Sequence, residues 1–285
     1  MATLEVNKMK VNHSKTERAL LVQGSTNVTD VKMLGNYICS AKEMEHRKEL
    51  VKGAFGSMAD VWKSRDEIDT KTRVFLYKMF IRPNFTYNIG AATYTKSQLE
   101  ELEALDRRQL RRVVGIFYPV HIQNEKLHEI TNTMTLTELF VQGRWQALGH
   151  LLRLPGGTPS NNAMNQFTEG PELMEGEEAP GVRLDRSGRL TTLPMLINED
   201  LQKITDWRKR KALFGVLRLQ TRADLDILRI VAADRDKWIV GWTAIVGASK
   251  VLWLESERNK SALREAAALR REEREMDITG SAGDV

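Results

Sequence analysis

Four arginines in one short stretch have the residue type and spacing most suited to chemistry. They are Arg107, Arg108, Arg111 and Arg112, and as i, i+1, i+4 and i+5 of an expected helix they predict one positively charged stripe. Such a stripe can follow a phosphate backbone and neutralise its charge. The same residues also stand near the expected helix end, where cations complement the negative end of the helix dipole. The sequence leaves both interpretations open.

A second group of candidates belongs to the next expected helix, at 135–152, and its immediate end. Arg144, His150 and Arg153 add positive or titratable side chains there, and we take the two arginines as further candidates for phosphate contact. Trp145 carries a ring of the kind that can stack on a base. Core packing is the commoner role of such a tryptophan, and it is the interpretation we favour.

The sequence contains no constellation typical of catalysis. The five histidines are scattered, and His121 and His128 stand two helical turns apart, which is too far to chelate one ion readily. Acidic residues spaced two apart in an expected helix, such as Asp224 and Asp226, diverge to different faces. A Gly-rich phosphate loop is also missing. We therefore expect no catalytic residue, no metal site and no cofactor for this chain alone.

Charge is unevenly spread along the chain. The 285 residues are 41% hydrophobic and 28% charged, with a formal net charge of +5, which suits a protein with a core and room for two domains. Up to Pro155 there are 23 Lys and Arg against 17 Asp and Glu, and beyond it 20 against 21. The basic first half favours an anionic partner such as nucleic acid. A mildly basic, solvated surface is the simpler alternative.

Cysteine usage and hydropathy bear on the compartment. Cys39 is the single cysteine, so a disulfide framework within the chain is impossible and a reducing compartment fits. No apolar run reaches the roughly 18 residues of a membrane span, and the N-terminus lacks a signal-peptide core. We expect an intracellular protein, nuclear or cytoplasmic, without membrane contact. The basic cluster at 207–211 is a candidate nuclear signal, although such clusters are more often solvated helix ends.

The hydrophobic periodicity changes from two to 3.6 near residue 40. Before that point it predicts a hairpin at 9–22 and a strand at 31–38 with a bend at Gly35. We then expect Pro83 to end one helix, and Ser97 and Gly115 to cap another. Segment 156–188 is rich in Gly, Pro, Asn and Glu and predicts a flexible linker. The expected helices are 41–63, 70–82, 97–114, 122–131, 135–152, 196–210, 222–246 and 251–274.

The order of these segments resembles the downstream part of reverse transcriptases of non-LTR retrotransposons. The likeness begins with KVNHSKTE and VKMLGNYI, which match a hairpin and a primer-grip strand, with Met33 where an aromatic residue is usual. It covers residues 4–242, and each motif alone is weak whereas their order is more specific. The further segments that carry it are TKTRVFLYKMFIRPNFTY, LEALDRRQLRRVVGI, QNEKL, GRWQALGHLLRLP, RLTTLPMLINEDL and DLDILRIVAADRDKW.

This resemblance implies a mainly α fold with a small β remnant of a polymerase palm. Together with the composition, it divides the chain into a palm remnant at 1–40, a helical thumb-like domain at 41–155, the linker at 156–188, a C-terminal helical region at 189–276 and a disordered tail at 277–285. It also implies that Lys15 approaches nucleotide phosphates in a whole enzyme. Palm polymerases need metal-binding aspartates that hold Mg²⁺, and the chain has no Asp-Asp pair. The expected function is therefore nucleic-acid binding, to RNA, DNA or their hybrid, without polymerase activity.

Three rival interpretations remain open. The chain could be a helical module of retrotransposon origin that binds a protein partner through exposed apolar faces or through its charged segment at 262–274. It could be half of an enzyme whose palm is supplied in trans. It could also be the product of a decayed reading frame with no selected role.

Overall fold

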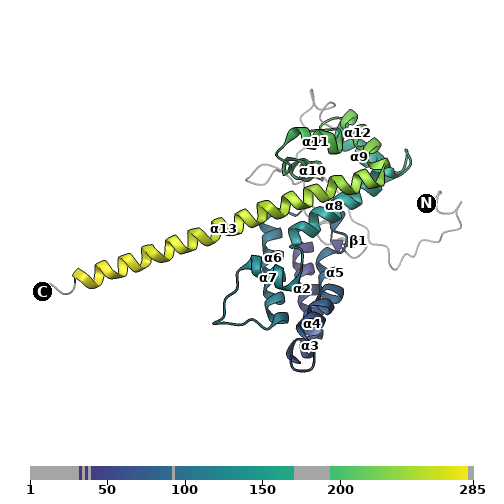
Figure 1. The fold of residues 1–285 in the computed structure, drawn as a ribbon. Coiled ribbons are helices and arrows are strands. Elements are labelled where there is room, and N and C mark those ends of the chain that lie inside the picture. Colours follow the sequence, from purple (N-terminus) through teal and green to yellow (C-terminus); the bar gives the residue numbers. More distant parts are fainter. Residues whose placement is uncertain (1–31, 34–35, 38–39, 92–93, 170–192, 282–285) are drawn as a thin grey trace, which may run out of the picture.

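The computed structural model describes residues 32–33, 36–37, 40–91, 94–169 and 193–281, and over these residues the chain is mainly helical, as expected (Figure 1). Two strands of two residues each, β1 (Lys32–Met33) and β2 (Asn36–Tyr37), pair antiparallel. The strand expected at 31–38 is thus two very short strands, and no larger sheet of a palm is seen in the described part of the chain. The hairpin expected at 9–22 lies outside the described residues.

The first helical region begins with α2 (Ser40–Ser57) and α3 (Ala59–Lys63), where one helix was expected. The next helix, α4 (Thr70–Leu76), continues through a π-helical turn, η3 (Tyr77–Ile81), into α5 (Arg82–Thr86). The prediction that Pro83 ends this helix is wrong. Pro83 lies in the first turn of α5, where its missing N–H costs no helical hydrogen bond. A short 3₁₀ helix, η4 (Ile89–Ala91), follows.

The helix with the four arginines is α6 (Lys96–Val114), which ends at Gly115 as expected, with φ of +87°. Its N-cap is Thr95, which forms a capping box with Gln98, so the expected capping role of Ser97 is wrong. Two helices follow it, α7 (Asn124–Thr131) and α8 (Leu136–Arg153). The bounds of these two agree with the sequence periodicity to within two residues.

The C-terminal half contains more helix than expected. The expected linker includes α9 (Pro159–Glu169), in which Met164 is buried, whereas 170–192 lie outside the described residues. The expected helix at 222–246 is broken at Asp234, and the chain beyond Asp234 forms one helix that also includes part of the expected tail. The remaining elements are α10 (Leu193–Gln202), α11 (Trp207–Phe214), α12 (Arg222–Ala233) and α13 (Arg235–Ser281).

Two hydrophobic cores organise these helices, and α8 belongs to both. Its first turns add Leu136 and Phe140 to a core formed with α2 to α7, while Trp145 and Leu148 enter a core formed with α9 to α13. The boundary between these two cores therefore runs along α8. Figure 1 shows α13 crossing α8 and projecting far beyond the rest of the described chain.

A glycine permits the close crossing of α8 and α13. A Cβ at Gly149 would collide with the indole of Trp238 on α13. That indole donates a hydrogen bond to the carbonyl oxygen of Trp145 at 3.0 Å. The crossing is thus fixed by a buried hydrogen bond as well as by apolar contact.

Candidate nucleic-acid interface

The four arginines of α6 do not form one continuous stripe. Arg107 forms an ion pair with Glu103 at 3.1 Å, and Arg111 donates hydrogen bonds to Asn124 Oδ1 at 2.6 Å and to the carbonyl of Ile122. Both are only partly exposed; the Arg107 pair lies within α6, whereas Arg111 connects α6 to the start of α7.

Arg108 and Arg112, by contrast, are exposed on the outer face of α6, one helical turn apart. Neither guanidinium has an ion pair or hydrogen bond with any residue that the structure describes. Their charges are therefore available to an anion in solvent, whereas the charges of Arg107 and Arg111 are used within the protein.

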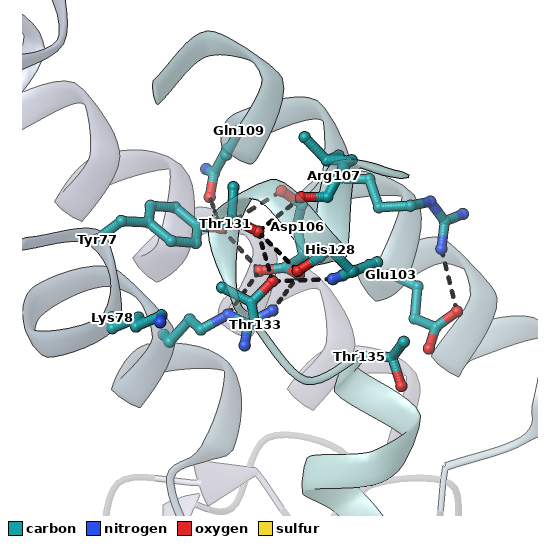
Figure 2. Close-up of polar contacts among 12 residues, drawn as sticks. Tyr77, Lys78, Glu103, Asp106, Arg107, Gln109, His128, Thr131, Thr133 and Thr135 are labelled. Atoms are coloured by element: carbon teal, nitrogen blue, oxygen red, sulfur yellow. Dashed lines mark hydrogen bonds and ion pairs between the residues drawn. The ribbon is translucent and has the colours of Figure 1, made fainter. Parts of the chain in front are cut away.

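A buried polar network fixes the opposite face of α6 (Figure 2). Asp106 is only 1% exposed, and its carboxylate accepts hydrogen bonds from the phenol of Tyr77 at 2.8 Å and from Arg82 Nη2 at 2.8 Å. The same phenol lies 3.1 Å from Gln109 Oε1. Burial, and then the charge of Asp106, raise the pKa of Tyr77, so the phenol stays a donor. The network anchors α6 to η3 and α5 and leaves its arginine-bearing face outward.

His128 lies on α7 beside this network (Figure 2) and also contacts α13. Its Nδ1 lies 2.9 Å from the hydroxyl of Thr133, and its ring meets the edge of Trp253 with 5.4 Å between centroids. The pKa of His128 is lowered to about 4, chiefly by burial; the negative charge of Asp106 opposes this shift and the positive charge of Arg82 adds to it. The imidazole is therefore neutral at physiological pH and acts as a packing group.

A polar groove of about 600 Å³ separates the start of α7 from the middle of α13. Glu257 accepts a hydrogen bond from the side chain of Asn124 at 2.6 Å, and Arg258 pairs with Glu125 at 3.5 Å across the groove. Burial alone would raise the pKa of Glu257, but hydrogen bonds from Asn124 and Lys260 outweigh it and lower that pKa. The groove walls thus carry three arginines and three glutamates, a balance that does not select a polyanion. The charged residues in this set are Arg111, Glu125, Glu257, Arg258, Arg264 and Glu265.

The two candidate arginines of α8 do not lie exposed on the surface as expected for phosphate contact. Arg144 is buried, with its Nη1 2.5 Å from Asp200 Oδ2. Arg153 is half-buried and donates to the carbonyl of Ala232 on α12 at 3.0 Å. Both guanidinium groups therefore hold helices together instead of facing a phosphate. Lys15 lies outside the described residues.

Trp145 has the packing role that we favoured. Its ring is fully buried, and its Nε1 donates to Asp200 Oδ2 at 3.0 Å. The rings of Phe214 and Trp238 contact it, with centroids 4.9 and 5.3 Å away. It cannot stack on a base in this conformation.

Sequence reasoning missed Arg65 and the loop after α6. The Arg65 guanidinium lies over the ring of Phe117, with its Cζ 4.6 Å from the centroid. It also lies against Gly115, where a Cβ would come within 3.3 Å of it. Gly115 is expected from the sequence only to end the helix, and because Arg65 and Gly115 are 50 positions apart, no local pattern signals this contact.

The described residues contain no group of three or more histidine, cysteine, aspartate or glutamate side chains placed to hold a metal ion. No helix among them is long and apolar enough to cross a membrane. Comparisons with protein-family models, curated proteins and solved structures found no match to this chain. The likeness to retrotransposon reverse transcriptases therefore remains a prediction from the order of the sequence segments.

Proposed function

We propose that this chain is a truncated reverse-transcriptase-like protein of retrotransposon origin that binds nucleic acid without polymerising it. The observation that supports binding most directly is the exposure of Arg108 and Arg112 on α6. Buried ion pairs and hydrogen bonds hold the inner face of this helix, so the two charges are presented from a rigid support. Contacts of this kind recognise the phosphate backbone and carry no sequence information.

The double substitution Arg108→Gln/Arg112→Gln tests this assignment. Glutamine keeps helix propensity while removing both charges. Each phosphate neutralised on a single strand contributes about 0.7 to the slope of log K against log salt, so the slope should flatten by about 1.4. Affinity should fall about equally for unrelated sequences. Fluorescence anisotropy across a salt series measures both quantities.

The matched control is Arg107→Gln/Arg111→Gln on the same helix. Because these arginines are engaged with Glu103 and Asn124, the control should leave the salt slope unchanged. It should also lower the free energy of unfolding by about 1–3 kcal/mol through broken charged hydrogen bonds. The exposed pair should change that free energy by less than about 0.5 kcal/mol. An unchanged slope in Arg108→Gln/Arg112→Gln would rule out this surface as the phosphate site.

The purified chain should show no primer extension on RNA or DNA templates with Mg²⁺ or Mn²⁺. The reason is that the resemblance assigns catalysis to a pair of aspartates, and the chain has no Asp-Asp pair. The measurement is incorporation of labelled nucleotide against a reaction without protein. Incorporation that persists in Lys15→Ala after stringent purification would contradict the prediction.

A further inference from the structure

We propose that the loop between α6 and α7 is a base-stacking platform that makes this chain select single-stranded nucleic acid. The inference rests on the proposed nucleic-acid binding and adds the class of ligand. Tyr118 is 87% exposed and Phe117 is 48% exposed, and the two are consecutive in the loop. Adjoining aromatic rings exposed to this extent are typical of a surface that binds a partner.

The rings are braced by neighbouring side chains. The Arg65 guanidinium covers one side of the Phe117 ring at 4.6 Å. The ring of Tyr118 meets the edge of His121, with 6.1 Å between centroids and an interplanar angle of 79°. The contact with Arg65 orients the Phe117 ring before any ligand arrives, which reduces the entropy lost on binding.

Two exposed arginines adjoin the loop, one along the chain and one in space. The loop follows Gly115, only three residues after the exposed Arg112, and Arg65 lies against Gly115 itself. The structure thus places exposed guanidinium groups beside exposed rings at one end of a helix. Arginines that reach phosphates, combined with aromatic rings that stack on bases, are the two components of sites for single strands.

A single strand fits this surface better than a duplex for two reasons. Bases in a duplex are already stacked and paired, so their faces are unavailable to Tyr118, whereas every base of a single strand has a free face. Few arginines are exposed here, and the acidic Asp66 and Glu67 directly follow Arg65, so phosphate contacts alone would give weak binding. Stacking must therefore supply much of the affinity.

The test compares three labelled probes of equal length: oligothymidylate, an abasic oligonucleotide with the same phosphates, and a duplex. The wild-type chain should bind oligothymidylate most tightly. Tyr118→Ala should weaken that binding about five- to 150-fold, which corresponds to the loss of one stacked base. Binding to the abasic probe should not change, nor should the salt slope, because no phosphate contact is removed. Tyr118→Phe should bind like the wild type.

Phe75→Ala provides the matched control, because Phe75 is 58% exposed on α4. It should bind oligothymidylate like the wild type. Thermal unfolding should be unchanged in Tyr118→Ala, since the ring lies almost entirely in solvent.

The platform is refuted if Tyr118→Ala binds oligothymidylate like the wild type, or if the wild type binds the abasic probe equally well. In both cases the proposed binding of nucleic acid survives. Failure of the wild type to bind any of the three probes refutes the proposed function itself, and the platform with it.

Discussion

Asp200→Ala should lower the free energy of unfolding by about 3–5 kcal/mol. The Asp200 carboxylate is 1% exposed and accepts from Arg144 at 2.5 Å, from Trp145 at 3.0 Å and from Lys203 at 2.7 Å. Removing it leaves the Arg144 guanidinium buried without a counter-charge. Arg144 Nε already has no hydrogen-bond partner among the described residues, so the loss of Asp200 leaves this buried guanidinium with still fewer acceptors. Urea denaturation measures the change.

Two controls separate charge from packing in this prediction. Glu199→Ala removes an exposed carboxylate from the neighbouring position and should change stability by less than about 0.5 kcal/mol. The double substitution Asp200→Leu/Arg144→Met removes both buried charges and should recover most of the loss, since apolar replacement of a buried ion pair is often neutral. A loss below about 1 kcal/mol in Asp200→Ala would show that Arg144 reaches solvent.

Lowering the pH from about 6.5 to about 4 should reduce the free energy of unfolding by up to about 3 kcal/mol through His128 alone. Burial lowers the pKa of this imidazole to about 4 from its ordinary value of 6.5. In that interval the unfolded chain binds the proton and the folded chain does not, so acid favours unfolding. The stabilisation is fully present above pH 6.5 and is lost as the pH falls.

Denaturant titrations at several pH values measure this dependence. His128→Phe keeps a ring against Trp253 and removes the titrating group, so its stability should fall less steeply over the same interval. His150→Gln, at an exposed position in the last turn of α8, should keep the wild-type profile. Identical profiles for the wild type and His128→Phe would contradict the assignment.

The sequence predicted the helices well where periodicity and caps are local. The bounds of α6 differ by one residue from the expected ones, and Gly115 ends it as expected. The cap was misassigned because Thr95 and Ser97 are both good N-cap residues, and only the backbone conformation distinguishes them. The composition of segment 159–169 is mostly polar and predicts a linker. Its buried residue Met164 is too little apolar pattern to indicate a helix.

The candidate site was predicted only in part because its partners are remote in sequence. Helical spacing correctly places the four arginines on α6, yet the pairing of Arg111 with Asn124 depends on how the next helix folds back. Arg144 and Asp200 are separated by 56 positions, so no local pattern indicates that this arginine is buried. The contact between Arg65 and Phe117 is equally non-local.

Because α8 belongs to two cores, the two halves of this helix can be buried only at different times during synthesis. Translation delivers Trp145 and Leu148 together with the first core, but their partners on α13 extend to Val246. At roughly 5–20 residues per second, the roughly 100 residues between Leu148 and Val246 take about 5–20 s to emerge. During that time the first core can fold while half of α8 keeps an apolar face uncovered. A ribosome stalled within this stretch would expose a folded first core with an uncovered apolar face on α8, which is the kind of surface that holding chaperones bind.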